Sequence, residues 1–144
     1  MNKPNTLAMD AVKPTDLPRS NDGKMQKLIY AFDVDGTLIK NGPAERQHGV
    51  VNDGDVPRVE WINTLMVLST AKNVRIVVWS GGGKNYAEMW GKRLGLDKYV
   101  WRYDTKLNHE MYKSMCDLLI AVDDIQATRL GDANVIVGQD RNDG

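Results

Sequence analysis

Three stretches of the chain are almost continuously apolar, and each has the length of one buried strand. They cover residues 28–32, 74–79 and 118–122. Short apolar runs rich in Val, Ile and Leu are typical of parallel strands that are covered on both faces. The pattern therefore predicts a parallel sheet built from at least these three segments.

Apolar residues between the strands recur at helical spacing. One helix is expected over about 56–70, with Asp55 as its cap and Pro57 in its first turn. Further elements are expected between these segments and after them: a helix from Tyr86 to Leu94, a strand at 99–103, a helix at 107–115 and a strand at 134–137. Strands that alternate with helices predict an α/β domain with helices on both faces of the sheet.

The chain has 144 residues, which is the size of one domain. Residues 1–23 are polar, carry three of the five prolines and show no lasting period, so we expect a flexible leader. A binding arm or an oligomer contact is the alternative for this segment. Residues 24–138 form the expected domain, and residues 139–144 form a polar tail.

Composition excludes some classes of function. The formal net charge is zero, so the chain lacks the overall positive charge of a nucleic-acid binder. No apolar run approaches the roughly 20 residues that span a bilayer, so no membrane partner is expected. A single cysteine, Cys116, fits a reducing compartment, and we expect a cytoplasmic protein.

Acidic side chains follow two of the apolar strands. Asp33 and Asp35 come after the first strand, and Asp123 and Asp124 come after the strand at 118–122. Parallel strands present their carboxyl ends at one edge of a sheet, where ligands bind. Clustered carboxylates suit a hard cation such as Mg²⁺, and an aspartate beside such an ion can attack phosphorus. Turn residues and helix caps are the plainer interpretation of these four positions.

The strand at 74–79 is followed by Ser80 and then by Gly81, Gly82 and Gly83, before a helix begins. Glycines let backbone N–H groups approach an anion, and a helix N-terminus adds its positive end. This arrangement is typical of a phosphate-binding loop. A plain flexible loop with Ser80 as a helix cap is the alternative.

These motifs resemble those of the haloacid dehalogenase (HAD) superfamily. Its first motif, Asp-x-Asp-x-Thr after a hydrophobic strand, stands here as Asp33-Val34-Asp35-Gly36-Thr37. Its second motif, a strand that ends in Ser or Thr, matches Ser80, and its fourth matches Asp123-Asp124. The resemblance covers about residues 28–138 and implies a three-layer Rossmann-like sandwich with a mostly parallel central sheet. A helical turn and a β-hairpin flap would follow the first motif. The intervals between motifs are too short for a cap domain.

The resemblance also implies roles for the acidic residues. Asp33 would be the nucleophile and a Mg²⁺ ligand. Asp35 would act as general acid and then as general base, and its backbone carbonyl would contact the metal. Asp123 would complete the metal site with Asp124, and which of these two binds the ion directly stays open.

Other residues would hold the phosphate. Ser80 and the Gly81 N–H would bind its oxygens, and a lysine would neutralise charge between the phosphate and the nucleophile. Lys106, after a strand and before the helix that leads to Asp123, has the family's layout, whereas Lys84 in the glycine loop is the alternative.

The expected activity is that of a phosphatase, a phosphoric monoester hydrolase that uses Mg²⁺ and an aspartyl-phosphate. The phosphorylated substrate would be a nucleotide, a nucleic-acid end or another large molecule, and nucleic acid would enter only as substrate. A homo-oligomer that lends a cap is an open alternative. Loose candidates for substrate contacts are Arg46, His48, Arg58 and Lys84. Two other classes stay open: a HAD-like regulatory module without turnover, and a receiver-type phosphoacceptor domain.

Overall fold

The computed structural model describes residues 25–41, 54–124 and 129–138. The expected leader and tail therefore lie outside the described residues, as do the candidate substrate contacts Arg46 and His48. Within the described ranges, every helix is too short or too polar to cross a membrane.

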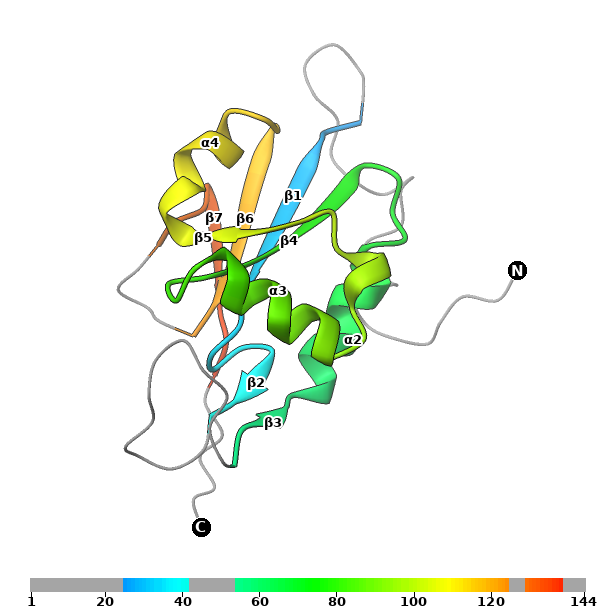
Figure 1. The fold of residues 1–144 in the computed structure, drawn as a ribbon. Coiled ribbons are helices and arrows are strands. Elements are labelled where there is room, and N and C mark those ends of the chain that lie inside the picture. The colour runs from blue at the N-terminus through cyan, green and yellow to red at the C-terminus, as the bar shows by residue number, and fades with distance from the viewer. Residues whose placement is uncertain (1–24, 42–53, 125–128, 139–144) are drawn as a thin grey trace, which may run out of the picture.

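Five strands form the central sheet, in the order β5-β4-β1-β6-β7, and all neighbouring pairs are parallel (Figure 1). Their bounds are β1 Leu28–Asp33, β4 Val74–Ser80, β5 Arg102–Thr105, β6 Leu118–Asp123 and β7 Ala133–Ile136. The three apolar runs become the three central strands, β4, β1 and β6, because these are buried on both faces. Strand β1, the first strand that the described residues form, is thus the middle strand of the sheet.

The register brings the chemically interesting residues to one edge. Asp33 is the last residue of β1 and pairs with Trp79, one residue before Ser80. Phe32 pairs with Val122, so Asp123 ends β6 level with Asp33. The chain builds β4 and β5 on one side of β1 and then crosses to build β6 and β7 on the other. Such a reversal beside the central strand is where open α/β sheets bind ligands.

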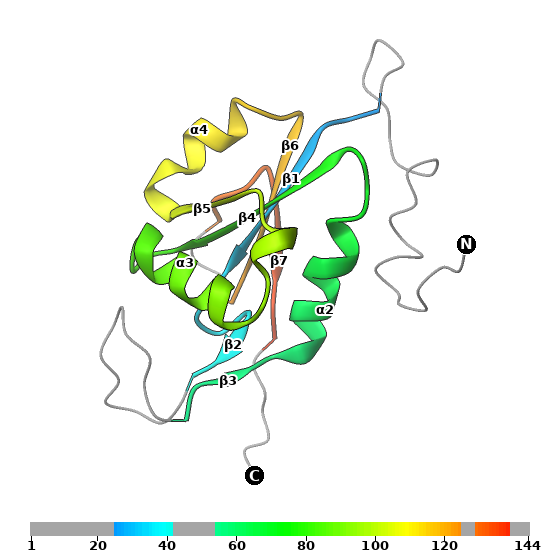
Figure 2. The same ribbon diagram turned by 45° about the vertical axis from the view of Figure 1, so that its right-hand side comes forward.

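Helices cover both faces of this sheet (Figure 2). Helices α2 (Val59–Leu68) and α3 (Lys84–Arg93) pack on one face, through Leu65, Leu68, Tyr86 and Trp90 among others. The other face carries the shorter α4 (His109–Lys113), whose Tyr112 packs against Trp79. Two short 3₁₀ turns, η2 (Asp97–Tyr99) and η3 (Lys106–Asn108), flank β5. The predicted α/β class with a parallel sheet flanked by helices is confirmed.

The prediction for the start of α2 was wrong. Val56–Pro57 form strand β3, which pairs antiparallel with β2 (Ile39–Lys40), so Pro57 lies outside the helix. The helix begins at Val59, and Arg58 rather than Asp55 precedes it. The hairpin expected after the first acidic motif is therefore present, and its pairing overrides the local capping signal. The strand expected at 99–103 begins only at Arg102, because Asp97–Tyr99 form a 3₁₀ turn.

Candidate active site

Three buried or half-buried carboxylates meet one lysine at the carboxyl edge of the sheet. Asp33, Asp123 and Asp124 each offer an oxygen, and these oxygens lie within 4.8 Å of one another. The Lys106 ammonium lies 2.8 Å from Asp33 Oδ1 and 2.7 Å from Asp123 Oδ2. Asp33 and Asp123 are only 4% and 3% exposed, so this charge cluster is largely removed from water.

Burial makes the ionised state of these carboxylates costly. It raises the pKa of Asp33 well above its usual value; the Lys106 ammonium opposes that rise, and the negative charge of Asp123 adds to it. Burial, together with the hydrogen bond and charge of Asp123, raises the pKa of Asp124 to about 6. Burial would lower the pKa of Lys106, but the charge of Asp33 and the hydrogen bond to Asp123 outweigh it and raise the pKa. A cation bound among the carboxylates would offset this desolvation cost and the repulsion between their charges.

Lys106 is presented by a tightly bonded turn that starts at Asp104 in β5. The Asp104 carboxylate accepts hydrogen bonds from the Thr105 N–H, the Asn108 amide and the Tyr112 hydroxyl. Burial opposes ionisation of Asp104, but these donors prevail and lower its pKa. The turn is thereby fixed between β5 and α4, which holds the lysine over the acidic cluster.

Asp35 is held by donors from two other elements. Its Oδ1 accepts a hydrogen bond from the Tyr86 hydroxyl at 2.8 Å and another from the Asn41 amide at 3.0 Å. Tyr86 lies in the first turn of α3 and is 4% exposed, so its hydroxyl is fixed by packing. In the sequence Tyr86 stands only as an apolar position of a helix, and Asn41 belongs to no motif. The Tyr86 contact has no sequence signal, because Tyr86 is 51 residues away along the chain, whereas Asn41 is only 6 residues away but belongs to no recognisable motif.

The glycine loop after β4 lies beside these residues. Ser80 is 2% exposed, and its hydroxyl accepts a hydrogen bond from the Gly82 N–H at 2.9 Å. Gly83 precedes α3 with φ of 105°, a conformation that favours glycine. The loop thus enters α3 through a backbone turn that a larger residue would strain.

A cavity of about 370 Å³ joins the parts of the site. Its lining consists of Asp33, Asp35, Ser80, Gly81, Gly82, Lys106 and Asp124. Asp123 lies behind this lining, where it binds Lys106 and accepts a hydrogen bond from the Asp124 N–H. Of the described candidates for substrate contacts, Arg58 and Lys84 lie outside the lining. Arg58 instead donates to the backbone carbonyls of Gly36 and Gly138, which ties the loop after β1 to the segment that follows β7.

Gly36 has a steric role beside Asp124. A Cβ at Gly36 would lie 2.0 Å from Asp124 Oδ2. The φ angle of Gly36 is +83°, a backbone conformation that residues with a side chain rarely adopt. We expect Gly36→Ala to destabilise the fold by about 1–3 kcal/mol from backbone strain alone and to displace the Asp124 carboxylate. Gly81→Ala is the matched control, since a Cβ there would meet no atom within 4 Å. Chemical unfolding of both variants measures the difference, and equal stabilities would contradict the close contact.

The site combines a buried carboxylate next to an ammonium, a second carboxylate held by neutral donors, and a hydroxyl beside glycine N–H groups. The carboxylate beside the ammonium, Asp33, can act as a nucleophile, and the second carboxylate, Asp35, can exchange protons. The Ser80 hydroxyl and the glycine N–H groups can hold an anion. Searches against protein-family models, curated proteins and solved structures found no match for this chain.

Proposed function

We propose that the protein is a Mg²⁺-dependent phosphohydrolase that cleaves a phosphomonoester through an aspartyl-phosphate on Asp33. The observation that supports this most is the position of Lys106, between the Asp33 and Asp123 carboxylates at 2.8 and 2.7 Å. A cation fixed there neutralises charge at the point where a phosphate must approach a carboxylate.

The carboxylates fit a magnesium ion. Asp33, Asp123 and Asp124 offer three hard oxygen ligands within 4.8 Å of one another. Asp33 and Asp124 line the cavity, so we assign them the positions nearest the ion, and we assign Asp123 the support of Lys106. The backbone carbonyl of Asp35 is the further ligand that the family resemblance implies. Bound Mg²⁺ would supply the positive charge that lets an anionic nucleophile meet an anionic phosphate.

The chain's own residues account for each transfer. Asp33 attacks phosphorus, the bond from phosphorus to the ester oxygen breaks, and Asp35 gives a proton to that oxygen. Asp35 then takes a proton from a water molecule, which attacks the aspartyl-phosphate and releases phosphate and free Asp33. Ser80 and the Gly81 N–H hold the phosphoryl oxygens, and Lys106 balances their charge.

The resemblance to the HAD superfamily supports the same assignment, because Asp33, Asp35, Ser80, Lys106 and Asp124 line one cavity. Short intervals between the motifs favour a member without a cap domain, whose open site would accept a large phosphate ester. The single cysteine supports a cytoplasmic location.

The direct test is hydrolysis of p-nitrophenyl phosphate with Mg²⁺, with EDTA, and after Mg²⁺ is added back. We expect turnover only with the metal, because carboxylates without it repel the phosphate. Equal turnover in EDTA would overturn the proposal. A panel of phosphorylated nucleotides, nucleic-acid ends, sugars and peptides would then identify the substrate class.

The Tyr86 hydroxyl should matter most for substrates with poor leaving groups. Tyr86→Phe removes the hydrogen bond that positions Asp35, so proton donation to the ester oxygen becomes less efficient. We expect hydrolysis of an alkyl phosphate to fall about tenfold or more, while that of p-nitrophenyl phosphate changes little. Tyr30→Phe, the same change on β1, is the control. An equal loss on both substrates would show that Tyr86 only supports the fold.

A further inference from the structure

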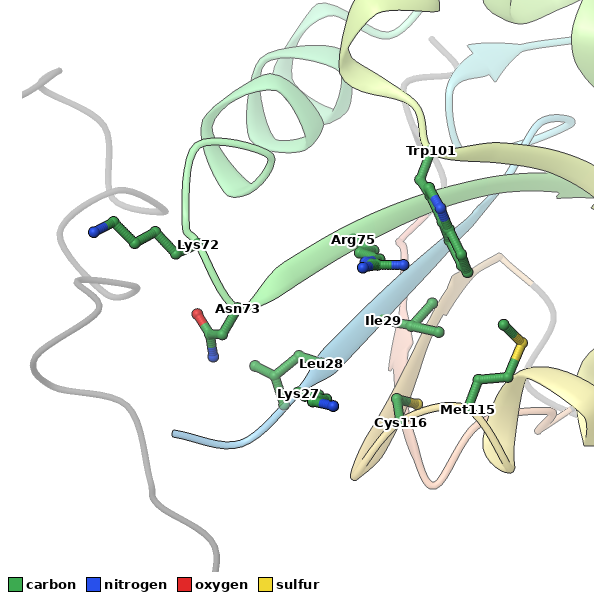
Figure 3. A pocket seen from close by; sticks show the side chains of 9 residues that line it. All are labelled: Lys27, Leu28, Ile29, Lys72, Asn73, Arg75, Trp101, Met115 and Cys116. Atoms are coloured by element: carbon green, nitrogen blue, oxygen red, sulfur yellow. The ribbon is translucent and has the colours of Figure 1, made fainter. Parts of the chain in front are cut away.

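A second cavity lies at the opposite end of the sheet, where β1 and β4 begin (Figure 3). Its volume is about 260 Å³, near the lower end of ligand pockets, which span about 300–1,000 Å³. Leu28 and Ile29 open β1 and line this cavity, whereas Asp33 ends the same strand in the candidate active site. Five residue steps of about 3.3 Å separate Leu28 from Asp33 along the strand, so the two cavities are about 17 Å apart. A ligand here would leave the acidic site open.

One side of this cavity is apolar. Figure 3 shows Ile29, Trp101, Met115 and Cys116 gathered around the hollow. Ile29 is 2% exposed and forms the floor, while Met115 is 40% exposed at the rim. Helix α4 ends at Lys113, two residues before Met115, so the helix does not cover this end of the sheet face. The cavity therefore offers an apolar wall to a small ligand.

The other side is cationic. Lys27, Lys72 and Arg75 line the cavity, and among the described residues no acidic side chain does so. Lys72 extends away from the hollow in Figure 3, whereas Arg75 lies next to Trp101. Within the described part of the chain, none of these three cations forms an ion pair. The charge of Arg75, beside Trp101, is thus available to a ligand in the cavity.

Arg75 is held in place by Trp101. Its guanidinium carbon lies 4.7 Å from the centroid of the indole, and that of Arg102 lies 4.4 Å from the same ring. A guanidinium over an indole ring is attracted by the π electrons of the ring, and its N–H donors can still bind an anion. Because this contact already restricts the side chain, an anion that binds it loses less entropy. The guanidinium of Arg75 is therefore a preorganised hydrogen-bond donor for an anion beside the apolar side chains of the cavity.

We propose that the cavity bounded by Arg75, Trp101 and Met115 binds a small organic anion. Its charged head, a carboxylate or a phosphate, meets the N–H edge of Arg75, and its apolar body lies against Ile29, Trp101 and Met115. This site is independent of the proposed phosphatase chemistry, because it shares no lining residue with the acidic cavity.

The test is an NMR titration of the full ¹⁵N-labelled chain in EDTA, followed through the indole N–H of Trp101. Trp101→Phe assigns that signal among the four tryptophans. The probes are benzoate and phenyl phosphate. Benzyl alcohol is the control with an aromatic ring but no charge, and acetate is the control with a carboxylate but no aromatic ring. We expect saturable binding of at least one aromatic anion, at least about tenfold tighter than either control. Whichever of the two aromatic anions binds more tightly identifies the preferred head group, a carboxylate or a phosphate.

Three variants decide which residues bind the probe. Arg75→Gln should weaken binding about tenfold or more. Arg93→Gln is the matched control, because Arg93 also stacks on a tryptophan, Trp90, at 5.7 Å but lies outside the cavity. Asp33→Asn should bind the probe as the wild type does. Equal binding of benzyl alcohol, unaltered binding in Arg75→Gln, loss of binding in Asp33→Asn, or a Trp101 signal that never shifts would each overturn the proposal.

Discussion

Asp33→Asn should abolish the Mg²⁺-dependent hydrolysis of p-nitrophenyl phosphate, with a fall in kcat of at least about 10³-fold. An amide has no anionic oxygen with which to attack phosphorus, and it also removes one ligand of the proposed ion. Asp33 ends the central strand at 4% exposure beside Lys106, so no other described carboxylate occupies its place.

The fold of this variant should survive, because the amide relieves a costly buried charge. Burial raises the pKa of Asp33, because its negative charge costs desolvation free energy that a neutral amide avoids, and Lys106 keeps Asp123 as an ion-pair partner in this variant. Circular dichroism and chemical unfolding check that point. Asp97→Asn, the same substitution in the η2 turn, should keep full activity. An active Asp33→Asn variant would exclude Asp33 as nucleophile.

Lys106→Met should have the second largest effect, on both activity and stability. The methionine leaves Asp33 and Asp123 without the ammonium that lies 2.8 and 2.7 Å from them. We expect kcat to fall about 10²–10³-fold, as when a donor to a developing anion is lost. Removal of one partner from a buried ion pair typically costs about 3–5 kcal/mol of unfolding free energy. Steady-state kinetics and urea unfolding in metal-free buffer measure the two effects.

Lys84→Met is the control for this variant and addresses the alternative lysine. Lys84 begins α3, is exposed and lies outside the lining of the acidic cavity. Its replacement should change kcat by less than about tenfold and leave stability unaltered. A larger loss in Lys84→Met than in Lys106→Met would assign the phosphate-neutralising role to the glycine loop.

The central strands and the acidic edge could be predicted because they depend on local sequence. The runs at 28–32, 74–79 and 118–122 are apolar enough to be strands in any α/β fold, and parallel topology then brings Asp33, Ser80 and Asp123 together. The layout of HAD-like motifs favours Lys106 over the alternative Lys84, and Lys106 lies beside Asp33 and Asp123 in the structure.

The remaining features depend on contacts between distant residues. Asp55 and Pro57 have the composition of a helix start, but pairing of β3 with β2 holds Pro57 in a strand. The strand expected at 99–103 overlaps β5 only at Arg102 and Tyr103, because the register with β4 rather than an apolar run sets its bounds. The Tyr86 hydroxyl reaches Asp35 across 51 residues, which no local pattern reveals.

Two other classes of protein predict different behaviour at Asp33. A receiver-type domain would become phosphorylated and keep the phosphoryl group. A regulatory module without turnover would bind Mg²⁺ but would never become phosphorylated. The arrangement of Asp35 favours turnover, since Tyr86 and Asn41 hold this carboxylate at the edge of the same cavity. Release of phosphate by the wild type distinguishes a phosphatase from both alternatives, and a stable phosphoryl group on Asp33 distinguishes a receiver-type domain from a regulatory module.

The most direct measurement is the mass of the Asp35→Asn variant, quenched in acid after mixing with substrate and Mg²⁺ and then mapped by peptide. Under the proposed mechanism, loss of the Asp35 carboxylate should leave slow phosphoryl transfer to Asp33 and stall hydrolysis of the intermediate. The account predicts one phosphoryl group on the peptide that contains Asp33, and none in an Asp33→Asn, Asp35→Asn double variant. A phosphoryl group on Asp123 or Asp124, or no covalent species while the wild type turns over, would contradict it.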